Sequence, residues 1–255
     1  MSYPENSRSS TTADGKRPRR VPDIKFSATD LGLPPKHKLC GKIIFRPTLI
    51  EDIEDIKRIM SYWLGTYHDQ FPEHADRRNL LHKIFKNNIE RINHFVSGCV
   101  DRGHFFTLVK SGIVLGVTGY LDGERMNQPL REFLDKKSNY TDQHGNYYDL
   151  RKPVPEMCFL YTSPNPEHRE DIPIGRVVMN GLKGAIYQAW RAGYFIFTSR
   201  RVWWKDGWAF YDRQPDFECI GVLGDIGGEC APEERDTRVY LVRECNKPVP
   251  ITLRS

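Results

Sequence analysis

The chain has 255 residues, of which 39% are hydrophobic and 28% are charged, values typical of a soluble globular protein. No stretch approaches the ~18 consecutive apolar residues of a membrane helix, and the polar N-terminus lacks the apolar core of a secretory signal. The six cysteines form no C-x-x-C pair, which argues against a zinc site and against a disulfide scaffold. We therefore predict no metal site, no membrane partner, and reduced thiols in a cytoplasmic or nuclear protein.

The net charge of +5 is concentrated near the N-terminus. Residues 1–41 hold eight Lys/Arg against four Asp/Glu, whereas the remaining residues hold thirty against twenty-nine. This distribution argues against a basic nucleic-acid-binding face on the fold. Residues 1–38 are rich in Ser, Thr, Pro and charge, and are predicted to form a flexible tail. The basic cluster from Lys16 to Arg20 within it is a solvated stretch, a nuclear import signal or a weak anion contact.

The first half of the body is predicted to contain a strand, two helices and a hairpin. Residues 42–46 form the strand, and apolar residues at helical spacing place helices at about 48–64 and 76–100. Residues 105–121 form two strands joined by a tight turn. Residues 122–154 are polar and irregular, and we interpret this long loop either as a lid or as an insertion without a role.

The second half is predicted to alternate between strands and helices. An apolar run at 157–162 forms a strand, and a long amphipathic helix follows the next turn. The apolar positions of this helix are Ile174, Val177, Val178, Leu182, Ala185, Ile186 and Ala189. A strand at 194–198, a short helix at 202–214 and strands at 217–222 and 238–242 complete the chain. This order implies a single α/β domain, residues 39–255, with a mixed sheet and helices on both faces.

The segment 156–192 combines a strand, a proline- and charge-rich turn and the start of the long helix. Pro173 suits the first helical turn because its missing N–H would have no helical partner there. The N–H groups of Ile174, Gly175 and Arg176 lie at the helix start, where free N–H groups and the helix dipole suit an anion such as a phosphate. Gly175 also lets a ligand approach the backbone closely.

In four segments the chain resembles the GCN5-related N-acetyltransferase (GNAT) family, over residues 42–245. The segments are Phe45-Arg46-Pro47 with Glu51-Asp52-Ile53, the hairpin 105–121, Leu160-Tyr161-Thr162-Ser163-Pro164 with Arg169 and Pro173-Ile174-Gly175-Arg176, and Trp208-Ala209-Phe210-Tyr211 continuing to Phe217. The resemblance implies a twisted, mostly antiparallel sheet with helices on both faces, and acetyl-CoA as the acyl donor.

The loop that would bind the donor departs from the family pattern of Gln or Arg, two residues, Gly, one residue, then Gly or Ala. With Gly175 in the last position, Pro173 replaces the first glycine and Glu170 replaces the basic residue. Arg169 fits only if the loop is one residue longer than usual. In the later segment, five residues rather than the family's four separate Tyr211 from Phe217.

The resemblance implies how the donor would be held. The N–H groups near Ile174, Gly175 and Arg176 would bind its pyrophosphate, and backbone near Tyr161 and Thr162 would align its thioester. The side chains of Arg176 and Arg169 could reach a phosphate. For Arg176 the alternative is an ordinary exposed helix residue.

The resemblance also implies how protons would move. Tyr211 would protonate the leaving thiolate, and the alternative is that Tyr211 is only a packed aromatic residue. Glu156, at the head of the strand, would be the base that takes the proton of the amine. Its alternative is an exposed strand-end carboxylate, with Asp122 and Glu124 as reserves for the base.

We therefore predict an acetyl-CoA-dependent N-acetyltransferase that passes the acetyl group directly to an amine in a ternary complex. The acceptor is either a small-molecule amine or a protein amine. The first alternative, which the departures in the loop suggest, is a non-catalytic acyl-CoA-binding or scaffold module of the same fold. The second is a nucleic-acid-directed transferase that uses the basic leader and the patch from Trp203 to Lys205.

Overall fold

The computed structural model describes residues 24–70, 104–121, 128–168, 172–200, 207–223 and 237–251. Several sequence-based predictions concern residues outside these ranges. They are the basic cluster at 16–20, the helix at 76–100, the reserve carboxylates Asp122 and Glu124, the phosphate ligand Arg169, and the patch at 203–205.

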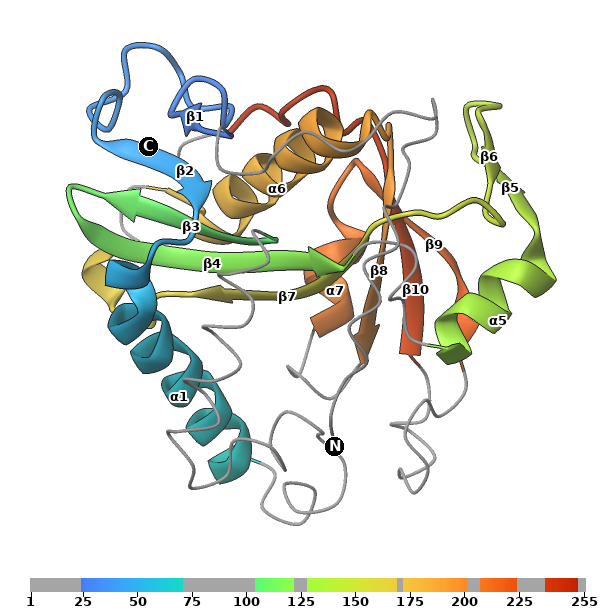
Figure 1. Ribbon diagram of the computed structural model, residues 1–255, viewed down its shortest axis with the longest axis horizontal. Coiled ribbons are helices and arrows are strands. Elements are labelled where there is room, and N and C mark those ends of the chain that lie inside the picture. Colours follow the sequence, from blue (N-terminus) through green and yellow to red (C-terminus); the bar gives the residue numbers. More distant parts are fainter. Residues whose placement is uncertain are drawn as a thin grey trace.

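One eight-stranded sheet forms the centre of the molecule, in the order β1-β2-β3-β4-β7-β8-β10-β9 (Figure 1). Along the chain its strands are β1 (Phe26–Ser27), β2 (Ile43–Pro47), β3 (Phe105–Lys110), β4 (Ile113–Leu121), β7 (Glu156–Thr162), β8 (Phe195–Arg200), β9 (Phe217–Leu223) and β10 (Thr237–Val242). Neighbouring strands are antiparallel except for β7 and β8, which are parallel. The predicted mixed, mostly antiparallel sheet is confirmed.

Two long helices cover opposite faces of the half of the sheet that contains β3, β4 and β7. On one face Val114 and Val117 of β4 share a core with α1 (Ile53–Gln70), which a short 3-10 helix (Ile50–Asp52) precedes. On the other face Leu115 of β4 shares a core with α6 (Ile174–Trp190). All seven predicted apolar positions of α6 are buried. Val114 and Val117 share a face although they are three residues apart, because β4 has a bulge with one extra residue between Val114 and Gly116.

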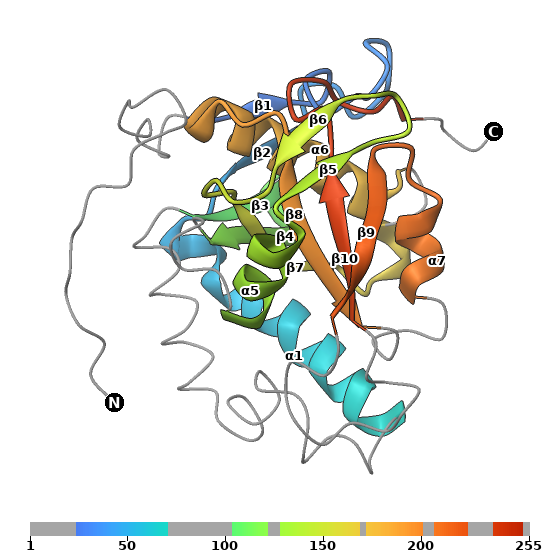
Figure 2. The ribbon, with the colours of Figure 1, turned by 90° about the vertical axis from the view of Figure 1, so that its right-hand side faces the viewer.

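The half of the sheet that contains β8, β10 and β9 is covered by two shorter helices (Figure 2). Leu130 and Leu134 of α5 (Gln128–Lys137) pack with Ile196 of β8 on one face. Tyr211 of α7 (Gly207–Asp212) packs with Phe197 of β8 on the other. Helices therefore cover both faces of the sheet, as predicted. None of the helices in the described ranges is long and apolar enough to cross a bilayer.

Residues 24–38 are packed against the body, so the prediction of a flexible tail up to residue 38 is wrong for this part. Phe26 pairs with Phe45 of β2, and Leu31 and Leu33 are buried. The carbonyl of Leu31 accepts a hydrogen bond from the side chain of Asn180 on α6, at 2.8 Å. These apolar residues show no regular period, because they pack on elements that are distant in sequence.

Residues 128–154 are ordered rather than irregular, which corrects the prediction for most of the segment 122–154. They form α5 and a two-stranded hairpin, β5 (Asn139–Thr141) and β6 (Tyr147–Asp149). The carboxylate of Asp142 accepts the backbone N–H groups of His144 and Asn146, at 2.9 and 2.8 Å, and so sets the turn. Strands of three residues are too short for an alternating pattern to be visible in the sequence.

Candidate functional site

Strands β7 and β8 are paired only at their starts. Glu156 is opposite Ile196, and Met157 is opposite Phe197. Beyond these residues the two strands run in clearly different directions (Figure 1). In the described part of the chain, the second half of β7 therefore has β4 on one edge and no strand on the other. An open edge in the middle of a sheet leaves room for a ligand that can pair with backbone groups.

A bulge sets which backbone groups face this open edge. Gly119 of β4 is opposite Phe159 and Tyr120 is opposite Met157, so that β7 carries one extra residue between them. After the bulge the N–H of Ser163 donates to the carbonyl of Leu115 of β4, at 2.7 Å. Because strand residues alternate, the backbone groups of Leu160 and Thr162 point the other way.

The backbone carbonyl of Thr162 already accepts a hydrogen bond. The indole Nε1 of Trp63, on α1, donates a hydrogen bond of 2.6 Å to the carbonyl of Thr162. This contact places α1 at the rim of the open edge. The contact joins residues 99 positions apart, so no local pattern could have indicated Trp63. Of the two residues, Leu160 is the one whose backbone carbonyl is not taken by Trp63.

The first turn of α6 lies at the end of this edge. Its N-cap, Pro173, provides no side-chain cap, and the turn contains no acidic residue. The N–H groups of Arg176 and Val177 both donate to the carbonyl of Pro173, at 2.8 and 3.1 Å. The N–H groups of Ile174 and Gly175 precede the point where helical acceptors begin. These two groups, with the helix dipole, favour an anion at this position.

Gly175 shows what surrounds that turn. A Cβ atom at Gly175 would lie 3.7 Å from Leu160, 4.0 Å from Thr162 and 3.8 Å from the ring of Phe210. These are ordinary contact distances, so packing does not require glycine here. The first turn of α6 therefore lies between the end of β7 and α7, with Gly175 facing both.

Tyr211 follows Phe210 on α7 and is packed in an aromatic cluster. Its ring centroid lies 4.6 Å from that of Phe197, 5.6 Å from Phe217 and 5.7 Å from Tyr240. Burial, and to a smaller degree Tyr161, raises the pKa of the Tyr211 hydroxyl. The hydroxyl consequently stays protonated at neutral pH. Since Phe197 is opposite Met157, Tyr211 is next to the point where β7 and β8 part.

Glu156 lies at that same point, as the first residue of β7. It is opposite both Ile196 of β8 and Leu121 of β4, and only 7% of its surface is exposed. The interpretation as an exposed strand-end carboxylate is therefore wrong. Glu156 is thus a buried carboxylate at the point where the two strands part.

Arg176 departs from one of its two sequence-based interpretations, because its side chain is not that of an ordinary exposed helix residue. The guanidinium is buried, and its Nη2 donates to Asp216 at 2.5 Å. Asp216 also accepts from Lys183 at 2.8 Å. The Nη1 of Arg176 is buried without a hydrogen-bond partner among the described residues, so the role of this side chain in binding phosphate stays a prediction.

The turn between β7 and α6 contains a hydrogen-bonded pair that the sequence did not reveal. The Ser163 hydroxyl and Nδ1 of His168 are 2.7 Å apart, and His168 ends a 3-10 helix (Pro166–His168). The N–H of Asn165 donates to the same hydroxyl, at 3.3 Å. Ser163 is 4% exposed, so this pair shapes the turn that leads to the first turn of α6.

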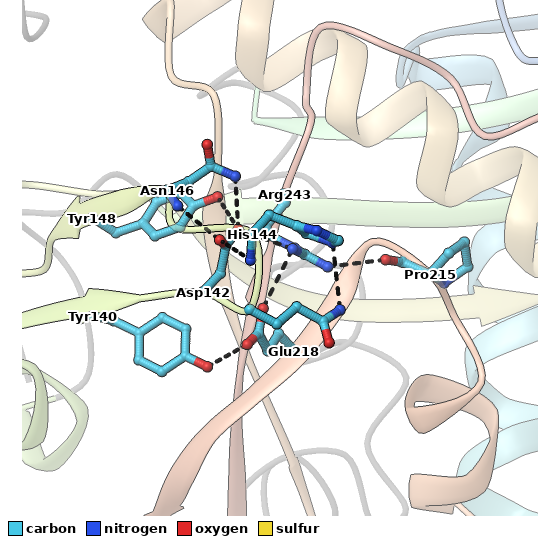
Figure 3. Close-up of polar contacts among 9 residues, drawn as sticks. Tyr140, Asp142, His144, Asn146, Tyr148, Pro215, Glu218 and Arg243 are labelled. Carbon is cyan, nitrogen blue, oxygen red and sulfur yellow. Dashed lines mark hydrogen bonds and ion pairs between the residues drawn. The ribbon is translucent and has the colours of Figure 1, made fainter.

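A second polar cluster holds the β5–β6 hairpin on the sheet (Figure 3). Arg243 donates to Asp142 at 2.9 Å and is 3.4 Å from Glu218. Tyr140 donates to Glu218, and Tyr148 donates to Asp142 at 3.1 Å. Burial, followed by these carboxylates, raises the pKa of Tyr140 and of Tyr148 to about 12. A cavity of about 360 Å³ lies beside the cluster.

Comparison with known proteins identifies similar folds only. No family model and no curated protein sequence matches the chain. A GNAT-family acetyltransferase from Streptococcus agalactiae has 10% identity and a TM-score of 0.48, over 79% of this chain and 95% of that one. An agmatine N-acetyltransferase mutant has 11% identity and a TM-score of 0.47, over 79% and 99%. A putative acetyltransferase from Salmonella typhimurium, solved with acetyl-CoA, has 10% identity and a TM-score of 0.47, over 82% and 98%.

Proposed function

We propose that this chain is an acetyl-CoA-dependent N-acetyltransferase that passes the acetyl group directly to an amine in a ternary complex. The observation that carries the proposal is the position of the Ile174 and Gly175 N–H groups at the end of the open edge of β7. Acetyl-CoA joins a pyrophosphate to an extended arm that contains amides and ends in a thioester. A helix start suits the first part, and a free strand edge suits the second.

The residues divide between these two parts. Ile174 and Gly175 would hold the pyrophosphate through backbone N–H groups, and the Nη1 of Arg176 stays a proposed phosphate ligand. Leu160 would pair with the arm through its backbone, with Tyr161 and Thr162 completing the strand. Trp63 and Phe210 would line the two sides of the open edge of β7. Arg169 stays a proposed phosphate ligand on sequence grounds alone.

Two proton transfers accompany the formation of the N–C bond and the breaking of the C–S bond. Glu156 would accept the proton of the amine, directly or through a water molecule, so that its lone pair can attack. Tyr211, protonated at neutral pH, would donate its proton toward the leaving sulfur. Both residues lie where β7 and β8 part.

The acceptor is an amine of a small molecule or of a protein. The proposed location is cytoplasmic, with nuclear import through residues 16–20 as the alternative.

One experiment tests the proposed transferase activity. Labelled acetyl-CoA is incubated with the full chain and with panels of amines, peptides and nucleic acid, and transfer is counted. Transfer to at least one amine is expected, whereas binding of acetyl-CoA without transfer to any acceptor would contradict the proposed enzyme.

A non-catalytic acyl-CoA-binding module is the second candidate. Two observations favour it. Pro173 occupies the place of a glycine in the family pattern, and the Arg176 guanidinium is committed to Asp216. Calorimetry with acetyl-CoA, together with the transfer screen, separates the two candidates. Binding with transfer supports the enzyme, binding without transfer supports the module, and absence of binding contradicts both.

A further inference from the structure

A buried charge cluster joins α6 to the turn that follows α7. Arg176 and Lys183 lie seven residues apart on α6, with 7% and 0% of their surfaces exposed. Both donate to Asp216, at 2.5 and 2.8 Å, and Asp216 is 2% exposed. Two cations thus share one carboxylate in the core. Buried charges are expensive to desolvate, so a cluster of this kind has to be held in a tight geometry by its partners.

The cluster connects the two halves of the proposed site. Arg176 belongs to the first turn of α6, next to the N–H groups of Ile174 and Gly175. Asp216 belongs to the turn that carries Tyr211 into β9. Through Arg176 and Asp216, the proposed donor-binding turn is therefore bonded directly to the segment that carries the proposed acid.

Backbone hydrogen bonds make that segment rigid. The N–H of Gln214 donates to the carbonyl of Tyr211 at 2.9 Å, and the N–H of Phe217 donates to the carbonyl of Gln214 at 3.1 Å. The ring of Phe217 is stacked on Tyr211, with 25° between their planes. The carbonyl of Asp216 accepts the N–H of Arg243 at 2.8 Å. A displacement of Asp216 would be passed on to Tyr211 through these bonds.

We infer that Asp216, acting through Arg176, is a positioning residue that fixes the distance between the donor-binding turn of α6 and Tyr211. This inference rests on the proposed function. Asp216 is buried, and its two carboxylate oxygens accept hydrogen bonds from Arg176 and Lys183. Its effect is on geometry, because a misplacement of about 1 Å between reacting groups lowers the rate by about 100-fold.

The test compares wild type with Asp216→Asn, Arg176→Met and Asn180→Leu. Arg176→Met is the milder variant, since it leaves Lys183 and Asp216 as a matched pair. Asn180→Leu is the control, because Asn180 is also a buried polar residue of α6 but binds the chain near its two ends. Melting temperature, Kd for acetyl-CoA and kcat with the best amine from the screen are measured well below the lowest melting temperature.

The positioning role predicts a specific pattern. Asp216→Asn and Arg176→Met lower kcat about 10- to 100-fold, and Asp216→Asn does so with an unchanged Kd for acetyl-CoA. Asn180→Leu lowers the melting temperature but leaves kcat unchanged. In the double variant Asp216→Asn/Tyr211→Phe the loss in kcat is no larger than in Tyr211→Phe alone, because Asp216 acts by placing the Tyr211 hydroxyl. Asp216→Glu restores part of the loss.

The outcomes separate this inference from the proposed function. Wild type that neither binds nor transfers contradicts both. Active wild type with full kcat in Arg176→Met contradicts the positioning role alone, and this variant decides the matter if Asp216→Asn fails to fold. Multiplicative losses in the double variant also contradict it, because they would show that Asp216 acts independently of Tyr211.

Discussion

Tyr211 packs through its ring and offers chemistry only through its hydroxyl. Tyr211→Phe keeps the contacts with Phe197 and Phe217, so we expect an unchanged melting temperature and an unchanged Kd for acetyl-CoA. Turnover should fall about 10²-fold, a typical contribution of a proton-donating side chain. Steady-state kinetics with saturating donor and acceptor measures the effect. Wild-type turnover in the variant would leave Tyr211 as a packing residue only.

Gly175 allows a matched pair of substitutions at the donor-binding turn. A methyl group at this position meets its neighbours at 3.7–4.0 Å, so Gly175→Ala should fold and bind acetyl-CoA. Gly175→Glu places a carboxylate where the pyrophosphate belongs, and we expect binding to be lost. A glutamate in the first helical turn interacts favourably with the helix dipole, so unfolding of the helix would not explain the loss of binding. Calorimetry on both variants measures the affinity, and equal affinities would place the donor elsewhere.

At the scale of elements, the β5–β6 hairpin depends on Asp142. Burial raises the pKa of this carboxyl, but hydrogen bonds from Asn146 and Arg243 outweigh burial and lower it well below the ordinary value. The folded-state pKa lies below that of the unfolded chain, about 3.9, so at acid pH the unfolded chain binds more protons. The stabilisation is complete above about pH 5 and is lost as pH falls toward the folded-state pKa.

The corresponding prediction compares wild type with Asp142→Asn. The free energy of unfolding of wild type should fall more steeply between pH 5 and pH 3, because only wild type has this carboxylate to protonate. Denaturant unfolding at a series of pH values provides the measurement. Parallel pH profiles for the two proteins would show that Asp142 has no lowered pKa in the fold.

The elements differ in how far the sequence predicts them. The apolar positions of α6 recur with a helical period, so a local pattern was sufficient to predict this helix and the place of Ile174 and Gly175 at its start. Tyr211 was indicated only by the resemblance to a family. The pairing of Arg176 with Asp216 spans 40 positions, and that of Trp63 with Thr162 spans 99. Contacts between distant segments leave no periodic signal. For the same reason, the sequence could not show where β7 parts from β8.

At the scale of the whole molecule, α6 is hydrogen-bonded to segments near both ends of the described chain. The side-chain amide of Asn180 donates to the carbonyls of Leu31 and Val249, at 2.8 Å each, and accepts the N–H of Val249 at 3.0 Å. A Cβ at Gly181, the next residue, would lie 2.5 Å from the ring of Phe45, so the helix is also packed closely on the sheet. The helix that starts at the proposed donor site is thus buried along most of its length.

Asn180→Leu should therefore destabilise the molecule as a whole. It leaves two carbonyls and one N–H without their partner, at a cost of about 1–3 kcal/mol for each group that stays buried. A protein of this size loses about 2–4 °C of melting temperature per kcal/mol. Thermal unfolding measures the shift. A melting temperature equal to that of wild type would mean that the chain ends do not depend on this side chain.

The central claim is that acetyl-CoA binds along the open edge of β7 with its pyrophosphate at the first turn of α6. Amide hydrogen exchange with and without acetyl-CoA tests it most directly, since it reports on backbone N–H groups. If acetyl-CoA binds there, amide exchange should become slower at Leu160, Ile174 and Gly175 when acetyl-CoA is present. Exchange in the β5–β6 hairpin should stay unchanged. Unchanged exchange at β7 and α6, with protection in another part of the protein, would contradict it.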